Sequence, residues 1–213
     1  MKGVILRMDE LSASIGNAGG KKSVFMIAIG SIMNEKAIVI YTSKRGSTKQ
    51  YAEWMAEDLG CEAVSLAEFD KATIPEYDLV IYGSWLRGSG IVDYDKLDPY
   101  LEGMKDRTVL FVTGVSEYNP ANYLQICEIN FDGRENMNQM QLYFCPGRYE
   151  PENVKGLDRM LMGIAKKVLK AGKTADDGGA ADKMIERIEN GVDLVDRRYT
   201  EPVLRAARKI LAK

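Results

Sequence analysis

Histidine is missing from the sequence: none of the 213 residues is a histidine. This absence excludes Ser-His-Asp and Cys-His catalysis, histidine-ligated metals, axial histidine ligation of haem, and histidine as a general acid or base. Any chemistry of this protein must therefore come from other side chains, from the backbone or from a cofactor.

Cysteine is scarce as well. Cys61, Cys127 and Cys145 are widely spaced and form no C-x-x-C pair. A zinc site or an iron–sulfur cluster needs four thiolates, or thiolates together with histidine. An odd number of cysteines also does not suit a disulfide framework. We therefore expect buried, reduced thiols in a cytosolic protein, and no metal site.

An excess of charge of either sign is absent too. Lys and Arg total 29 and Asp and Glu total 31, so the net charge is −2. A dedicated nucleic-acid binder usually carries a basic excess. We therefore do not expect nucleic acid among the partners.

The apolar stretch over residues 24–33 is too short to span a bilayer, which takes about 20 residues. It has the length of a signal-peptide core, but no clean cleavage site follows it. Met33-Asn34-Glu35-Lys36 suits a natural start. Residues 1–35 are therefore predicted to be an N-terminal extension or a mis-assigned start, with a leader and a membrane-directing segment as the alternatives.

From Lys36 onward, short apolar runs alternate with helical patterns. Strands are predicted over residues 37–41, 61–66, 78–84, 108–113 and 141–145. Helices are predicted before Gly60 and over 97–104, 119–129, 154–170 and 200–211, with a loop over 172–181. Strands separated by helices pair in parallel through right-handed crossovers. The expected fold is therefore α/β, with a doubly wound five-stranded parallel sheet and helices on both faces.

In such sheets, ligands bind outside the carboxyl ends of the strands. The loop after the first strand, Thr42-Ser43-Lys44-Arg45-Gly46-Ser47-Thr48, offers hydroxyls, two cations and a glycine just before a helix. These groups suit a phosphate, although simple capping of the helix is the alternative. The sequence G-x-x-x-x-G-K-[ST] is not present here, and Gly88-Ser89-Gly90 is only a weak match to a dinucleotide fingerprint.

The segments that carry a family resemblance are residues 41–48 and 77–88. The first resembles the FMN-phosphate loop of the flavodoxins, and the second resembles the third strand and second flavin-contacting loop of that family. Within the flavodoxins, residues 84–88, Gly147-Arg148-Tyr149 and Leu157-Asp158-Arg159-Met160 are similar to menaquinone-dependent protoporphyrinogen oxidases. The resemblance implies a flavodoxin-like strand order of 2-1-3-4-5. It also implies a single FMN-binding domain over 36–213, with a helical insertion at about 150–198.

The resemblance also implies which residues hold FMN. The cofactor-binding candidates lie in three loops: Ser43, Lys44, Arg45, Gly46, Ser47 and Thr48; Ser84, Trp85, Leu86, Arg87 and Gly88; Thr113, Gly114 and Tyr118. Trp85 and Tyr118 are candidates for stacking on the flavin ring. Lys44 and Arg45 either contact the phosphate or point to solvent. Arg87 either anchors a carboxylate of the substrate or forms a surface salt bridge. Glu117 either places negative charge near the ring or is a solvated acid of the loop.

The resemblance implies two possible functions. The first is an FMN-dependent oxidoreductase that passes electrons between a small substrate and an acceptor such as a quinone, with a porphyrinogen as one candidate substrate and no catalytic residue of its own. The alternative is a flavodoxin-type electron carrier that docks on a redox partner protein. Residues 154–170 form a basic amphipathic helix, which either packs on its own domain or contacts a membrane. The expected location is the cytoplasm, or, if this helix contacts a membrane, the inner face of the membrane.

Overall fold

A computed structural model of the chain describes residues 36–116, 118–131, 141–172 and 179–213. All of these ranges belong to one structural unit, Glu35–Lys213. The predictions for residues 1–35 and for Glu117 lie outside the described residues.

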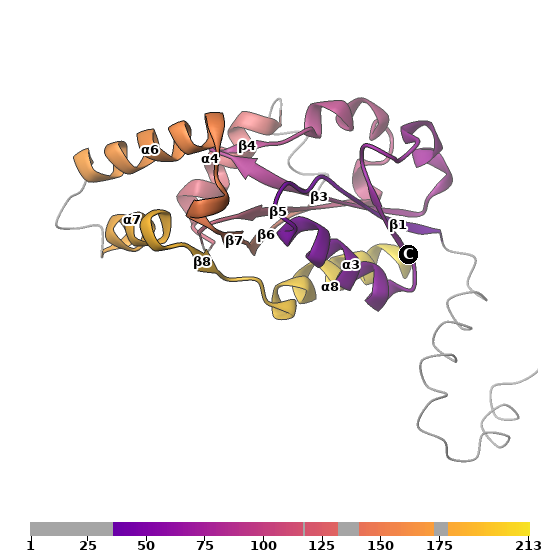
Figure 1. Cartoon of the computed structure of the whole chain (residues 1–213). Helices are drawn as coiled ribbons and strands as arrows, with labels where there is room; N and C mark the ends of the chain where they lie inside the picture. Colours follow the sequence, from indigo (N-terminus) through magenta and orange to yellow (C-terminus); the bar gives the residue numbers. More distant parts are fainter. Residues whose placement is uncertain (1–35, 117, 132–140, 173–178) are drawn as a thin grey trace, which may run out of the picture. The chain divides into compact units, whose positions relative to one another are not determined.

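The central sheet has five parallel strands in the order β2-β1-β3-β5-β6 (Figure 1). The strands are β1 (Ala37–Tyr41), β2 (Glu62–Ser65), β3 (Leu79–Arg87), β5 (Thr108–Gly114) and β6 (Gln141–Pro146). The short β4 (Gly90–Ile91) pairs antiparallel with the end of β3. The predicted α/β fold is confirmed. The short β4 pairs with β3 and is not one of the five parallel strands, so these five have the predicted order 2-1-3-4-5.

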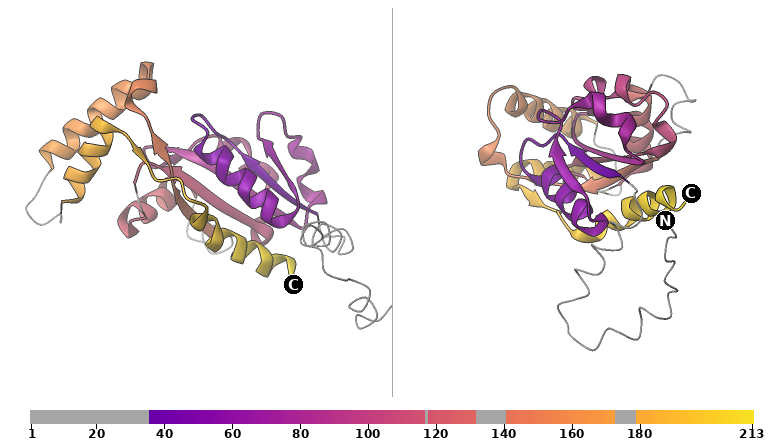
Figure 2. Two further views of the ribbon diagram at one scale, coloured as in Figure 1. Left: turned by 60° about the horizontal axis from the view of Figure 1, so that its bottom comes forward. Right: turned by 90° about the vertical axis from the view of Figure 1, so that its right-hand side faces the viewer.

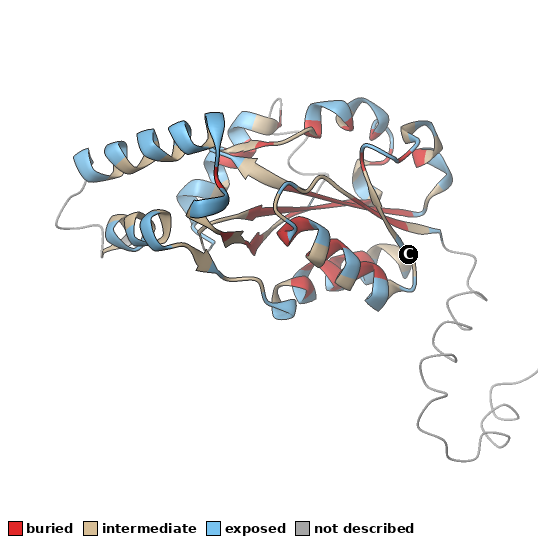
Figure 3. Cartoon of the chain, viewed as in Figure 1, coloured by how far each residue is buried: buried red, intermediate tan, exposed pale blue. Residues whose placement is uncertain are grey.

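Each face of the sheet is buried by its own layer of helices. Val39 of β1 packs with α3 (Ser47–Leu59) and α8 (Glu201–Leu211), whereas Ile38 and Ile40 pack on the opposite face with α4 (Pro120–Asn130). This alternation is the period of two that a strand imposes on its side chains. Figure 3 shows the buried residues concentrated along the strands and on the inner sides of α3 and α8.

The predicted helix over 97–104 is wrong. The chain forms short 3-10 turns instead, over Tyr94–Lys96, Asp98–Tyr100 and Lys105–Arg107. Pro99 has no amide hydrogen for a helical bond, and Gly103 has a left-handed φ of +76°. The apolar spacing was nevertheless informative, because Leu97, Leu101 and Met104 are buried while Tyr100 is exposed.

After β6 the chain leaves the sheet and forms a helical hairpin. A two-stranded antiparallel ribbon, β7 (Arg148–Tyr149) with β8 (Val192–Asp193), forms its base. The hairpin consists of α6 (Gly156–Ala171) and α7 (Ala180–Asn190). Both helices lie side by side beyond the carboxyl ends of the strands (Figures 1 and 2). α7 was not predicted as a separate helix, although it lies within the helical insertion expected at about 150–198.

α6 and α7 are held together by ion pairs at one side. Lys166 and Lys170 of α6 both contact Glu189 of α7, at 3.0 and 3.6 Å. No residue of α6 is buried in the core. Across the described ranges, no helix combines the length and the apolar character needed to cross a bilayer.

Candidate functional site

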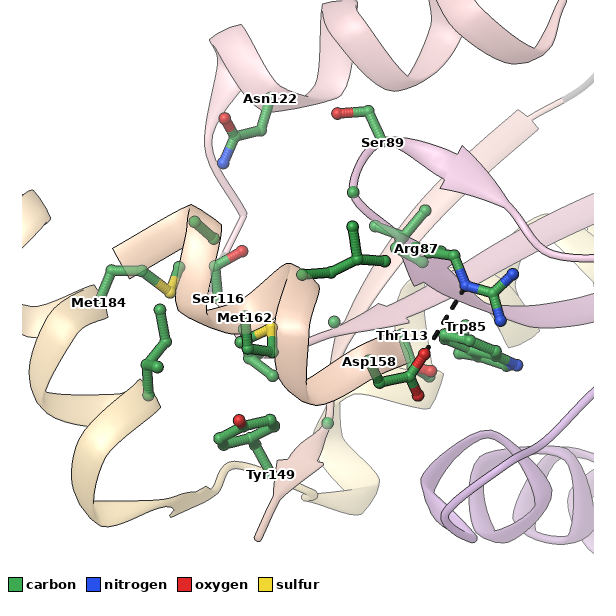
Figure 4. Close-up of a pocket in the computed structure, with 18 of the residues that line it drawn as sticks. Trp85, Arg87, Ser89, Thr113, Ser116, Asn122, Tyr149, Asp158, Met162 and Met184 are labelled. Carbon is green, nitrogen blue, oxygen red and sulfur yellow. Dashed lines mark ion pairs between the residues drawn. The ribbon is translucent and has the colours of Figure 1, made fainter. Parts of the chain in front are cut away.

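A cavity of about 890 Å³ lies at the carboxyl end of the sheet. Its lining comes from the loop before α3, the β3–β4 turn, the end of β5, α4, β7 and both helices of the hairpin (Figure 4). The predicted cofactor residues that line it are Lys44, Arg45, Ser47, Thr48, Trp85, Leu86, Arg87, Gly88, Thr113 and Gly114. The structure thus brings the three predicted loops together, as expected for a sheet of this order.

Four predicted residues do not line the cavity: Ser43, Gly46, Ser84 and Tyr118. Ser84 is fully buried, and its hydroxyl donates a hydrogen bond of 2.6 Å to the carbonyl of Val92. Tyr118 is 59% exposed, with its ring against Tyr123. The structure therefore gives neither Ser84 nor Tyr118 a position at the cavity, because one is turned into the fold and the other into solvent.

Ser43 and Gly46 shape the first loop instead of lining the cavity. The Ser43 hydroxyl accepts a hydrogen bond from the amide of Gly46 at 3.2 Å. Gly46 has a φ of +91° just before α3, and a methyl group added there would meet no atom within 4 Å. Glycine is therefore required by the left-handed backbone and not by crowding. Because Gly46 has no side chain to cap α3, the amides of the first helical turn are left as donors toward an anion.

Ser47 and Thr48 connect the first loop to the rest of the site. The hydroxyls of Thr48 and Thr113 form a buried hydrogen bond of 2.8 Å. The Ser47 hydroxyl accepts a hydrogen bond of 3.0 Å from the amide of Arg148. Both side chains therefore hold β5 and β7 beside the loop, a structural role that was not predicted from the sequence.

Three cations surround one carboxylate at the end of the cavity next to the first loop. Asp158 of α6 lies 2.6 Å from the Lys44 ammonium, 3.0 Å from the Arg45 guanidinium and 3.9 Å from Nε of Arg87. The hydrogen bond from Lys44 is the main reason why the pKa of Asp158 lies below its ordinary value. The cluster keeps an excess of positive charge, which suits an anion such as a phosphate.

Asp158 is the residue of this cluster that was not predicted from the sequence. It stands in the motif Leu157-Asp158-Arg159-Met160, but no role was assigned to it. Its side chain is only 11% exposed. For Arg87, the ion pair that was the alternative to substrate binding is present in the structure.

Trp85 lines the cavity beside Arg87 and Asp158 (Figure 4). The Lys44 ammonium is 5.4 Å from the centre of its ring, and the Arg87 guanidinium is 5.0 Å away. Both distances are within the range of a cation–π interaction. The half-buried ring therefore has a fixed neighbourhood and remains the candidate for contact with a flavin.

The second loop is a tight hairpin turn. Gly88 has a φ of +62°, which a two-residue hairpin turn of type II′ requires at its first central position. The side chain of Asn130 holds the turn, since it donates to the carbonyl of Ser89 and accepts from the amide of Ile91, both at 2.7 Å. Glycine is required at position 83 for a different reason: a methyl group there would lie 2.0 Å from the ring of Phe111.

The motif Gly147-Arg148-Tyr149 forms the base of the cavity. The amide of Gly147 donates to the carbonyl of Gly114 at 2.7 Å, and the Arg148 guanidinium contacts Asp193 at 2.7 Å. Tyr149 is buried and lines the cavity below α6 (Figure 4). Burial raises the pKa of the Tyr149 hydroxyl above its ordinary value.

The half of the cavity beneath the helical hairpin of α6 and α7 is apolar. Its walls include Leu161, Met162, Ala165 and Leu169 of α6 and Met184 and Ile188 of α7. Three uncharged polar residues also line the cavity, Ser116, Asn122 and Gln125, and the Arg187 guanidinium donates to the carbonyl of Val115 at 3.4 Å. Met184 and Ile188 are spaced i, i+4, which is the signal that could have revealed α7.

All three cysteines are free, and none belongs to the lining of the cavity. Cys127 and Cys145 are buried, as predicted, whereas Cys61 is only half-buried. Burial raises the pKa of the Cys61 thiol to about 11. Within the part of the chain that the structure describes, no cluster of three or more Cys, Asp or Glu could hold a metal ion.

Residues 38–176, more than half of the chain, match a family model described as "Flavodoxin domain". Among solved structures, the chain is similar to a flavodoxin from the domain Archaea at 19% identity, covering 62% of this chain and 98% of that one, with a TM-score of 0.35. It is also similar to the rubredoxin:oxygen oxidoreductase of Desulfovibrio gigas, at 16% identity over 84% of this chain and 37% of that one, with a TM-score of 0.42. For flavodoxin 2 from Bacillus cereus the identity is 16%, the coverage 62% and 99%, and the TM-score 0.30. No curated protein matches the sequence.

Proposed function

Because the chain belongs to the flavodoxin domain family, we propose that it is an FMN-dependent oxidoreductase that passes electrons between a small substrate and an acceptor such as a quinone. FMN is the cofactor that family membership indicates. When bound, it supplies the exchange of electrons and protons with the substrate. The absence of histidine is then no obstacle to the reaction.

The residues at the polar end of the cavity fit FMN. The first-turn amides of α3 and the cations Lys44 and Arg45 are suited to its phosphate. Asp158, an anion already held by these cations, shows that they can bind a negatively charged group here. Trp85, Thr113 and Gly114 line the adjoining part of the cavity and would orient the ring.

The apolar half of the cavity is the observation that carries the proposal of an enzyme. An electron carrier needs only an exposed flavin edge on which a redox partner protein docks. A compartment walled by apolar side chains of α6 and α7 and by α4, next to the flavin site, suits a small substrate instead. Its uncharged polar groups, such as Asn122 and Gln125, match the carbonyl groups of a quinone.

Protoporphyrinogen oxidation is a more specific form of the proposal. It is supported by the motif resemblance and by Arg87, whose guanidinium pairs with Asp158 at 3.9 Å but is 48% exposed and so accessible to a carboxylate of a porphyrinogen. The flavodoxin-type electron carrier is the alternative.

The first test is the identity of the cofactor. We expect the protein to bind FMN and not FAD, since the site offers one phosphate loop and only a weak match to a dinucleotide fingerprint. A titration that follows flavin fluorescence measures this directly. If FMN produces no quenching, the proposal fails at its first step.

The second test separates the enzyme from the carrier. Ala165 is half-buried on α6 and lines the apolar half of the cavity, so Ala165→Trp should fill that space. We expect this variant to bind FMN normally but to slow the reoxidation of its reduced flavin by menadione by about tenfold or more. The matched control is Ile129→Trp, at an exposed position of α4 outside the cavity.

The measurement is anaerobic stopped-flow absorbance of the flavin, with menadione or cytochrome c as the oxidant. A carrier would be reoxidised faster by cytochrome c than by menadione, and Ala165→Trp would leave both rates unchanged. That result would favour the alternative function.

A further inference from the structure

Exposed apolar side chains are concentrated on α6. In the described part of the chain, nine large apolar side chains are exposed, and five of them belong to this helix: Leu157, Met160, Leu161, Ile164 and Val168. Their spacings of three and four residues place them in one stripe. We propose that this stripe, the α6 stripe, docks on the surface of an anionic lipid bilayer.

The charges beside the α6 stripe favour an anionic surface. α6 carries four cationic side chains and one carboxylate. The carboxylate, Asp158, is paired with Lys44, Arg45 and Arg87 from outside α6. Lys166 and Lys170 contact Glu189 of α7. Arg159 and Lys167 are exposed and form no ion pair among the described residues. Lys167 borders the α6 stripe, whereas Arg159 lies about 100° beyond its edge on the helix surface. An exposed cation beside an apolar stripe binds anionic lipid head groups while the apolar side chains enter the acyl boundary.

A second copy of the chain fits the α6 stripe less well. A two-fold interface through the stripe places the same helix on both sides, so Lys167 and its counterpart in the other copy would both lie at that interface. α6 has no exposed carboxylate to compensate them, because Asp158 is only 11% exposed. Like charges brought together at an interface oppose association.

The geometry is that of a helix lying on the membrane and not crossing it. With 16 residues, α6 is about 24 Å long, which is shorter than the hydrocarbon core of about 30 Å.

The α6 stripe also borders the cavity. Leu161, Ile164 and Val168 belong to the stripe and line the cavity as well. A bilayer seated on the stripe would therefore lie next to the apolar half of the cavity. This step rests on the proposed function: a lipid-soluble acceptor could then pass from the membrane to the flavin without passing through water.

Co-sedimentation of the full, FMN-loaded chain with lipid vesicles tests the docking. The vesicles contain phosphatidylcholine alone, or an equimolar mixture of phosphatidylcholine and phosphatidylglycerol. We expect binding to the mixed vesicles, weaker binding to phosphatidylcholine alone, and weaker binding at high salt. This assay involves no redox step, so its outcome is independent of the proposed function.

The test variant is Leu157→Glu combined with Met160→Glu. Both side chains belong to the α6 stripe but not to the cavity lining, so FMN binding should be preserved and serves as the check on folding. Binding to the mixed vesicles should fall by about tenfold or more. The matched control is Ile129→Glu, which replaces an equally exposed apolar side chain on α4 and should bind as the unaltered protein does.

Two results would overturn the proposal. If the unaltered chain does not sediment with the mixed vesicles, or if the double variant sediments equally well, the α6 stripe is not a membrane surface. Light scattering tests the other possible occupant, a second copy of the chain. If the unaltered protein is a dimer and the double variant is a monomer, the stripe is a contact between copies.

Discussion

Asp158→Asn tests whether Lys44 and Arg45 hold the phosphate of FMN. In the structure these two cations contact the Asp158 carboxylate, at 2.6 and 3.0 Å. A phosphate bound by the same cations therefore lies close to a second negative charge. Asparagine keeps the shape of the side chain and removes that charge. We expect the variant to bind FMN more tightly than the unaltered protein.

The size of the effect follows from these distances. Two anions that contact the same cation lie about 5 Å apart, where unit charges repel by roughly 0.8 kcal/mol in water and about 3 kcal/mol at an effective dielectric constant of 20. The Lys44 side chain is 46% exposed, so solvent screens the cluster and the lower value applies. A change of about 1 kcal/mol corresponds to a roughly fivefold lower Kd for FMN.

Flavin fluorescence quenching at pH 7 and low salt measures this change. The pKa of Asp158 lies below its ordinary value, chiefly because of the hydrogen bond from Lys44, so the carboxylate is fully ionised throughout the titration. Riboflavin, which lacks the phosphate, should bind both proteins equally. Asp106→Asn, an exposed acid before β5 at the opposite end of the sheet, is the matched control. Unchanged or weaker FMN binding by Asp158→Asn would refute the reasoning and would mean that Asp158 positions the two cations.

Three further predictions concern the scaffold. Thr48→Val should lower the free energy of unfolding by about 1–3 kcal/mol, because it leaves the buried Thr113 hydroxyl without its partner; the double variant with Thr113→Val should recover part of this loss in denaturant titrations. Gly83→Ala should destabilise the domain by at least about 1–3 kcal/mol, since the added methyl group collides with the ring of Phe111; an unchanged melting temperature would contradict this close packing of β3 against β5. Cys61, whose thiol has a pKa of about 11, should react slowly with a disulfide reagent at pH 8 and faster as the pH rises toward that value; a rate at pH 8 like that of a free thiol would show that the thiol is not shielded.

The sheet could be predicted because its strands are buried on both faces. In a fold of this size, continuous apolar runs such as 37–41 and 108–113 can be buried in few ways other than as central strands of a sheet. The first loop could be predicted because its hydroxyls, cations and glycine are consecutive in the sequence. The same local logic failed at 97–104, where the apolar spacing was correct but Pro99 and Gly103 prevented regular helical hydrogen bonding.

The hairpin was harder to predict because its contacts are distant in sequence. Asp158 meets Lys44 across 114 positions, so nothing near either residue indicates the pair. α7 turns its apolar side chains toward a cavity and not toward the core, and its helical pattern is correspondingly short. Tyr118 had the right composition for a stacking residue, but its side chain points to solvent and not to the cavity.

The ribbon at the base of the hairpin has a consequence for the order of folding. α8 covers one face of the sheet, yet about 55 residues separate its start from the end of β6. Pairing of Arg148 with Asp193 and of Tyr149 with Val192 brings the two ends of this long segment together. Once the ribbon has formed, α8 is tethered by an effective loop of about a dozen residues. Closing that shorter loop costs about 1 kcal/mol less conformational entropy than closing the full segment. If the ribbon forms before α8 docks, substitutions at these four residues should slow refolding more than they speed unfolding.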